Sequence, residues 1–220
     1  MSAGPNLGSN ANTCSSEATA STAGGIKSPH GDEAILTYDV LDEKQAIRSV
    51  ADDGAGATVL FSGTTRDSFR GKQVTRLEYE AYSSLALKTL QSLLVKAHTS
   101  APFAENPIPL SANADPQSND SSEDRITRCY IAHRLGAVSV GECSILIAVS
   151  SPHRKEAFAV AEWLLEEVKK NVAVWKREFY ATGDVVTARD GDAGPLDPSR
   201  AETADASTSD WSWKANFPAA

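Results

Sequence analysis

Basic side chains stand at the predicted start of one helix, directly after Ser151-Pro152. A serine caps a helix well and a proline suits its first position, so His153 and Arg154 would occupy the first turn. Free backbone N–H groups and the positive end of the helix dipole already favour an anion there. An arginine and a histidine would add charge and directional donors, as a phosphate site requires. Because basic side chains are mildly unfavourable at this end of a helix, we prefer a functional interpretation to an ordinary exposed surface.

A second basic group follows the same predicted helix, at Lys169-Lys170 and then at 175–178 (WKRE). Lys169 and Lys176 are seven residues apart, so in a continuous helix they would point the same way, about 10 Å apart. A lysine partly shielded from water beside Trp175 would suit proton transfer or nucleophilic attack. The alternative is a solvated helix end, where the dipole favours lysine, and for Lys170 we prefer it.

Other residues of chemical interest have simpler explanations. The segment 61–67 (FSGTTRD) follows a predicted strand but lacks the spacing of a nucleotide-binding P-loop. His133 lies in a predicted strand, where a hydrogen-bonded structural histidine is the simpler interpretation. The three cysteines, Cys14, Cys129 and Cys143, have no CxxC or metal-ligand spacing, so the sequence predicts neither a disulfide framework nor a metal site. The cytosol, a reducing compartment, is the expected location.

Composition indicates where the ordered core that must position these side chains lies. The chain has 220 residues and a formal net charge of −8. Three segments rich in small and polar residues are interpreted as a disordered N-terminal tail, a flexible insertion and an acidic, flexible C-terminal tail: residues 1–30, 101–125 and 190–220. Without the insertion, the single domain at 31–189 has balanced charges, so the acidity belongs to the appendages.

The same composition excludes two function classes. An acidic chain with a neutral core argues against general nucleic-acid binding, which depends on Lys and Arg neutralising phosphates. No apolar run approaches the roughly 20 residues that a membrane-spanning helix needs, so we expect no integral membrane protein.

The ordered segments carry both strand and helix patterns. Strands are predicted at 34–40, 57–61, 74–82, 128–135, 143–149 and 185–188. Helices are predicted at 43–50 with Asp42 as cap, at 84–98 with Ser84 as cap, and at 152–171 with Ser151 as cap. The last has apolar residues at helical spacing along most of its length. Together the patterns predict an α+β domain with about three helices.

The motifs, taken in order, resemble the large, catalytic subunit of the molybdopterin synthase family. The matching segments are 61–67, 77–82 (LEYEAY), 132–136 (AHRLG), 141–142 (GE), 150–154 (SSPHR) with 157–158 (AF), Lys169, and 175–178. No single segment is decisive, but the ordered set is specific and spans nearly all of the predicted core.

The resemblance implies a fold, a partner and a reaction. The family fold is a single α/β hammerhead-type domain with a mixed or antiparallel sheet, which forms a homodimer within a heterotetramer. A small ubiquitin-like sulfur-carrier subunit presents a C-terminal Gly-Gly thiocarboxylate. Its sulfur is transferred to cyclic pyranopterin monophosphate to make the molybdopterin dithiolene, without a bound cofactor or metal. A sulfurtransferase with no candidate catalytic cysteine is consistent with a partner that brings the sulfur.

The resemblance also assigns residues. Lys169 and Lys176 correspond to two catalytic lysines that also contact the substrate. The remaining positions correspond to substrate-binding residues, of which Arg189 matches an arginine that reaches the neighbouring protomer's site: Phe61, Arg66, His153, Arg154, Arg177, Glu178 and Arg189. The alternative function is a non-catalytic domain of the same fold that binds a phosphate ligand or docks a partner, and ligand binding without turnover would distinguish it.

Overall fold

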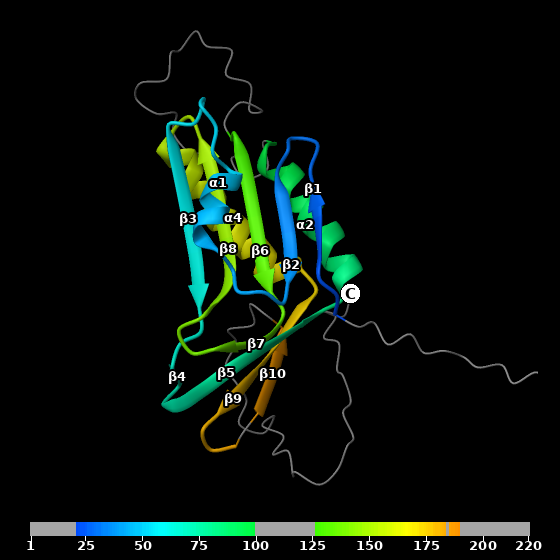
Figure 1. Ribbon diagram of the computed structural model, residues 1–220, viewed down its shortest axis with the longest axis vertical. Coiled ribbons are helices and arrows are strands. Elements are labelled where there is room, and N and C mark those ends of the chain that lie inside the picture. Colours follow the sequence, from blue (N-terminus) through cyan, green and yellow to red (C-terminus); the bar gives the residue numbers. More distant parts are fainter. Residues whose placement is uncertain (1–20, 100–125, 184, 190–220) are drawn as a thin grey trace, which may run out of the picture.

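Ten strands form two sheets in the computed structural model, which describes residues 21–99, 126–183 and 185–189 (Figure 1). The first sheet has the order β1-β2-β6-β8-β3, and only β2 and β6 pair in parallel. Its strands are β1 (Gly24–Lys27), β2 (Glu33–Thr37), β3 (Ala57–Thr64), β6 (Arg128–Arg134) and β8 (Cys143–Ser151). The sheet is therefore mixed, as predicted.

The second sheet lies beyond one end of the first (Figure 1). It has the order β10-β9-β5-β4, with β7 paired to β5. Its strands are β4 (Ser68–Phe69), β5 (Lys72–Ala81), β7 (Gly136–Ser139), β9 (Val174–Tyr180) and β10 (Val185–Arg189), and all their pairings are antiparallel. Only Leu135 separates β6 from β7, so a single residue passes the chain from one sheet to the other.

Three helices cover the two faces of the first sheet (Figure 1). The helices α2 (Ser83–Ala97) and α4 (Arg154–Asn171) pack on one face, and α1 (Glu43–Ser49) packs on the other. Asp42 caps α1 as predicted, because its Oδ1 accepts a hydrogen bond from the Lys44 backbone N–H at 2.8 Å. The predicted α+β class with three helices is confirmed. No helix among the described residues is long and apolar enough to cross a membrane.

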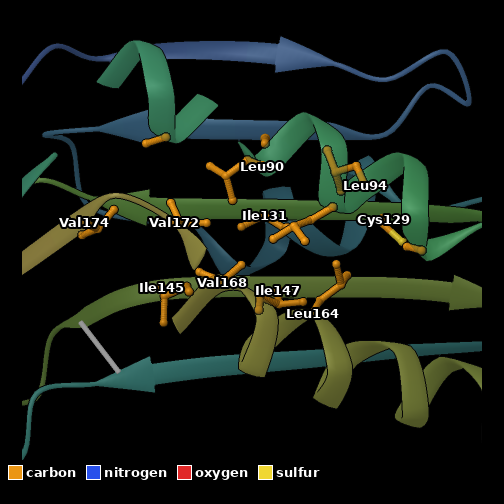
Figure 2. Close-up of a cluster of buried hydrophobic side chains, with 14 of the residues drawn as sticks. Leu90, Leu94, Cys129, Ile131, Ile145, Ile147, Leu164, Val168, Val172 and Val174 are labelled. Atoms are coloured by element: carbon orange, nitrogen blue, oxygen red, sulfur yellow. The ribbon is translucent and has the colours of Figure 1, made fainter. Parts of the chain in front are cut away.

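The central strand β8 is buried on both faces, and its side chains alternate between two apolar clusters. Ile145, Ile147 and Val149 face α2 and α4, whereas Leu146 and Ala148 face α1. Figure 2 shows α2 and α4 side by side over β6 and β8, with their apolar side chains meeting around Ile131 and Ile147. The larger cluster continues through Val172 and Val174 into the second sheet, which is thereby held against the first.

Several predicted boundaries are wrong. The helix predicted from Ser84 begins at Ser83, and its cap residue is Tyr82, with no side-chain capping bond. The helix predicted from Pro152 begins at Arg154, because β8 runs on to Ser151. The residues of β1 were assigned to the N-terminal tail, and β7 and β9 were not predicted as strands. Residues 1–20, the insertion 101–125 and the C-terminal tail 190–220 lie outside the described residues.

A buried polar network ties the β1–β2 hairpin to the end of α2 and the start of β6. The Asp32 carboxylate is 1% exposed. It accepts hydrogen bonds from the Ser28 hydroxyl at 2.5 Å and the Cys129 backbone N–H at 2.8 Å, and it pairs with His98 Nε2 at 3.0 Å. Burial alone would raise the pKa of the Asp32 carboxyl, but the bonds from His98 and Ser28 outweigh it and hold the pKa below its ordinary value of 3.8.

This network predicts acid sensitivity. A carboxyl whose pKa is lower in the folded chain stabilises the fold fully above its unfolded pKa, near 4, and loses that contribution as the pH falls through the folded pKa. The free energy of unfolding, measured with urea, should therefore fall below about pH 4. Asp32→Asn should lower it by about 2 kcal/mol at pH 7, because buried donors lose a charged acceptor. The same variant should flatten the acid limb, and an unchanged limb would contradict this account.

Candidate active site

His153 and Arg154 lie where β8 meets α4, at the end of the first sheet remote from the second sheet (Figure 1). His153, not Ser151, is the cap residue of α4. The Ser151 hydroxyl accepts a hydrogen bond from the His153 backbone N–H at 3.1 Å and donates one to the His153 carbonyl at 2.9 Å. This turn leaves both the His153 and Arg154 side chains exposed to solvent. Arg154 lies in the first turn as predicted, whereas His153 precedes the helix, because the helix begins two residues later than predicted.

Lys169 and Lys170 lie in the last turn of α4, at the opposite end of that helix. The Lys169 ammonium is 3.7 Å from a carboxylate oxygen of Glu166, and its side chain is 40% exposed. Lys170 is fully exposed. The helix ends at Asn171, so the seven-residue spacing to Lys176 is not a helical spacing, and the geometric reason for pairing Lys169 with Lys176 was wrong. The two lysines nevertheless lie on either side of one junction, between α4 and β9.

Lys176 belongs to one face of β9, together with Glu178 and Tyr180. Side chains two residues apart in a strand point to the same side. The Lys176 ammonium is 3.2 Å from Glu178 Oε1, and the Tyr180 hydroxyl donates a hydrogen bond to Glu178 Oε2 at 2.6 Å. Glu178 and Tyr180 are buried, and the Lys176 side chain is 21% exposed. The lysine is therefore held at the edge of the buried region by a carboxylate that is itself fixed.

Arg177 points to the other face of the same strand. It lies directly opposite Glu78 of β5, and its guanidinium pairs with Glu78 and more closely with Glu80. The resemblance assigned Arg177 and Glu178 to one substrate-binding run, but the pleat of β9 sends their side chains to opposite sides of the sheet. Substrate binding by Arg177 stays a prediction, and its described contacts are with two glutamates.

Phe61 lies midway along β3, whereas Arg66 lies beyond the end of β3 that meets the second sheet. Phe61 pairs with Ile147 in the sheet and packs against the α2–α4 cluster. Arg66 follows the end of β3 and is exposed, with its guanidinium carbon 5.7 Å from the centre of the Phe69 ring. Backbone bonds to the β7–β8 turn, at 3.0 and 2.9 Å, anchor the neighbouring Thr65. This anchoring fixes where the loop that carries Arg66 leaves the sheet.

Arg189 is the last residue of β10, and its backbone lies opposite Trp175. The adjacent pair in the register is Ala188 with Lys176. The chain at Arg189 therefore returns to the α4–β9 junction, next to the strand segment that carries Lys176.

The predicted site residues thus fall into two groups at opposite ends of α4. Arg66, Lys169 and Lys176 belong to the end where the two sheets meet, whereas His153 and Arg154 belong to the far end (Figure 1). Phe61 lies between them, midway along β3. From residue 153 to residue 169 the helix rises about 24 Å at 1.5 Å per residue. A small phosphate ester is much shorter than that span, so one copy of the chain does not bring the two groups to one such molecule.

The described residues contain one cluster with metal-ligand chemistry, formed by Asp32, His98 and Cys129. Both carboxylate oxygens of Asp32 already accept hydrogen bonds. Burial raises the pKa of the Cys129 thiol, which disfavours the thiolate that a metal would bind. The cluster is satisfied by its own hydrogen bonds and explains the attachment of the hairpin.

Sequence reasoning missed Tyr180, Glu78 and Glu80 as partners of the basic residues. Valine and aromatic residues at both ends of 174–180 (VWKREFY) are typical of a strand, and the two-residue period of a strand would have identified Tyr180 as a same-face neighbour of Glu178. The pairing of Arg177 with β5 depends on a strand register nearly 100 residues apart in the sequence, which no local pattern contains.

The fold and site define a class: a two-sheet α+β protein with basic side chains at both ends of one long helix. A sequence model of the MoaE protein family matches residues 36–171. The molybdopterin synthase catalytic subunit of Emericella nidulans is 40% identical over 163 residues, which cover 72% of this chain and 72% of that protein. The chain belongs to the MoaE protein family, and the resemblance seen in its motifs is confirmed.

Solved structures agree with this assignment. Molybdopterin synthase from Staphylococcus aureus has a TM-score of 0.55 and 27% identity, and the match covers 70% of this chain and 94% of that one. A complex of subunits 1 and 2 of the molybdopterin-converting factor from Helicobacter pylori has a TM-score of 0.51 at 19% identity, with 71% and 90% covered. The second likeness supports the fold alone.

The contacts of Arg177 predict a structural role. Arg177→Leu leaves Glu78 and Glu80 side by side without their cation, and we expect the free energy of unfolding to fall by about 1 kcal/mol, since the group is partly exposed. Adding Glu80→Gln should restore part of that loss, because one of the repelling charges is removed. Urea unfolding at low and high salt measures both effects. Equal stability of wild type and Arg177→Leu would leave Arg177 with a substrate role only.

Proposed function

We propose that this chain acts as the catalytic subunit of a molybdopterin synthase, transferring sulfur to cyclic pyranopterin monophosphate in molybdenum cofactor biosynthesis. Membership of the MoaE family carries this proposal, because a relative matched over most of both chains bears that name. The chain is thus an enzyme, a sulfurtransferase. Lys169 and Lys176 at the α4–β9 junction are its proposed catalytic groups.

The described thiols are poorly placed to supply the sulfur. Cys129 is 1% exposed, and burial raises the pKa of its thiol, so it is a poor nucleophile. Cys143 lies within β8, where its Sγ donates to the Ile145 carbonyl at 3.3 Å. A partner must then bring the sulfur, and we assign this role to a small ubiquitin-like carrier with a C-terminal Gly-Gly thiocarboxylate. The structural neighbour from Helicobacter pylori was itself solved as a complex of two subunits.

The proposed chemistry is acyl transfer. The thiocarboxylate sulfur attacks a side-chain carbon of the pterin and forms a carbon–sulfur bond while the carbon–oxygen bond at that carbon breaks. The departing oxygen takes up a proton, and carrier and pterin are left joined as a thioester. Water then cleaves the acyl carbon–sulfur bond, releasing the carrier as a carboxylate and leaving sulfur on the pterin. Lys169 and Lys176 offer ammonium groups to stabilise the oxyanion of this step, or an amine to accept the acyl group. Two such cycles give the dithiolene.

A second copy of the chain resolves the separation between the two basic groups. His153 and Arg154 lie about 24 Å along α4 from Lys169, so we propose that they serve the lysines of a neighbouring protomer. In a two-fold dimer this contact occurs twice, once in each direction. The arrangement fits a homodimer within a heterotetramer, and it also gives Arg189 a neighbouring site to reach.

The location follows the chemistry of the cysteines. Cys129 and Cys143 are free thiols, and free thiols persist in a reducing compartment. We therefore place this enzyme in the cytosol.

The first test removes a proposed catalytic lysine. Lys169→Ala should abolish product formation, a loss of at least about 100-fold, while the fold and carrier binding stay intact. Lys170→Ala is the matched control, because that neighbour is fully exposed, and it should keep wild-type turnover. The assay uses purified thiocarboxylated carrier and measures dithiolene formation. Full synthesis by Lys169→Ala would overturn the assignment, and carrier or phosphate binding without turnover in the wild type would favour the non-catalytic alternative.

The second test asks whether two copies build one site. His153→Ala and Lys176→Ala should each be inactive alone. After denaturation and joint refolding, mixed dimers contain one intact site of two, so the mixture should recover about a quarter of wild-type activity. Refolding each variant by itself is the control and should recover nothing. No recovery in the mixture, with mixed dimers verified by mass spectrometry, would mean that each site belongs to one chain.

A further inference from the structure

One face of β9 carries a buried chain of polar side chains that ends at a proposed catalytic lysine. Tyr180 is 5% exposed and Glu178 is 8% exposed, whereas the Lys176 side chain is 21% exposed. Burial therefore increases along the strand, away from Lys176. Tyr180 is the innermost member, and neither its position nor its hydroxyl is explained by substrate contact.

The two oxygens of the Glu178 carboxylate are divided between two partners. Oε1 lies 3.2 Å from the Lys176 ammonium, and Oε2 accepts a hydrogen bond from the Tyr180 hydroxyl at 2.6 Å. A short hydrogen bond from a hydroxyl to a carboxylate is strong and directional. It fixes the plane of the carboxylate and withdraws part of its charge, so it sets both the position and the strength of the pairing with Lys176.

The surroundings supply few other charged groups to this face. Tyr79 of β5 lies directly opposite Lys176, and its ring meets the ring of His133 edge-on at 4.9 Å. Lys72 of β5 lies over the Tyr180 ring, 5.5 Å from its centre. On the other side, Val186 of β10 lies opposite Glu178 in the strand register. Among the described neighbours, Glu178 is the carboxylate that pairs with Lys176.

We propose that Tyr180 is a positioning residue for sulfur transfer: its hydroxyl fixes the Glu178 carboxylate, which in turn holds the Lys176 ammonium at the α4–β9 junction. This inference rests on the proposed function of Lys176 and adds a residue to it. In this proposal Glu178 acts by holding Lys176, whereas the family resemblance assigned Glu178 to substrate binding.

The hydroxyl alone is removed in Tyr180→Phe. Without that hydrogen bond, the whole negative charge of the Glu178 carboxylate is available to Lys176, so the ion pair becomes stronger. The plane of the carboxylate is no longer fixed, so the position of the ammonium becomes less well defined. We expect kcat to fall about tenfold with KM nearly unchanged, which is the size of a hydrogen bond to a charged group. Tyr130→Phe is the matched control, because Tyr130 is 4% exposed and belongs to the apolar cluster beneath α1 on the other face of the first sheet, and it should leave kcat unchanged.

A double-mutant cycle tests whether Tyr180 acts through Glu178. If it does, Tyr180→Phe should change kcat less than twofold when Glu178→Gln is already present, because the fixed carboxylate is gone. A purely structural tyrosine would lower the melting temperature and give the same tenfold fall in both backgrounds. Equal falls in the two backgrounds would overturn the proposal.

Chemical labelling gives a readout that does not depend on turnover. The full chain is acetylated with acetic anhydride at one fixed pH, and the extent at Lys176 is measured by peptide mass spectrometry, with exposed Lys170 as internal reference. In Tyr180→Phe the extent of labelling at Lys176 relative to Lys170 should fall about threefold, because the carboxylate pairs more firmly with the ammonium, and in the Glu178→Gln background the same substitution should leave it constant. An unchanged extent in the single variant would overturn the positioning role.

The two arms separate this inference from the function on which it rests. Wild-type turnover by Lys176→Ala would refute a catalytic role for Lys176. The labelling of Lys176 in Tyr180→Phe would still decide whether Tyr180 affects the reactivity of the Lys176 amine through Glu178. Lys176→Ala could instead be inactive while Tyr180→Phe keeps full activity and unchanged labelling of Lys176. The proposed function would then stand, and the role of Tyr180 would be refuted.

Discussion

Burial of β8 on both faces is the constraint on which the rest of the molecule depends. A strand with helices on both sides must be apolar at consecutive positions, and Ile145 to Val149 meet that requirement without a break. Its burial determines where α4 begins, because the chain leaves the sheet only after Ser151 and turns at once into the helix. It also sets the direction of α4, which packs back along the sheet and ends beside the second sheet (Figure 1).

The length of α4 then determines the architecture of the site. A helix of 18 residues that covers the sheet from end to end necessarily separates whatever its two termini carry. Its start carries His153 and Arg154, and its end carries Lys169 and leads into β9 with Lys176. Shortening the helix would expose the Ile147 side of the core, so the two basic groups cannot approach within one copy without loss of packing. A symmetric neighbour brings them together at no such cost.

Patterns within short stretches of the sequence correctly predicted the features that depend on interactions between neighbouring residues. The cap at Asp42, the apolar stripe of α4 and the three helices all follow from interactions between residues close in the chain. The failures have distant causes. Ser84 resembles a cap, but Ser83 is committed to the Thr22 backbone N–H at 2.8 Å, 61 residues away. β9 was missed because β5, far away in sequence, supplies the hydrogen bonds that make residues 174–180 extended. For the same reason the lysine pair was predicted with a helical geometry it does not have.

The buried partners of Lys176 are better explained by function than by stability. Taking an ammonium and a carboxylate out of water is unfavourable, and a buried ion pair often contributes less than well-packed apolar side chains of the same volume. Apolar side chains do fit next to this network, because Val174 precedes Lys176 on β9 and Val186 lies opposite Glu178 on β10. The Tyr180 hydroxyl offsets part of the penalty by satisfying the second oxygen of Glu178, and a fully satisfied network keeps one geometry. A fold selected for stability alone would have no use for an ammonium held at a fixed position on the edge of its core, whereas the acyl transfer that we propose at the α4–β9 junction requires one.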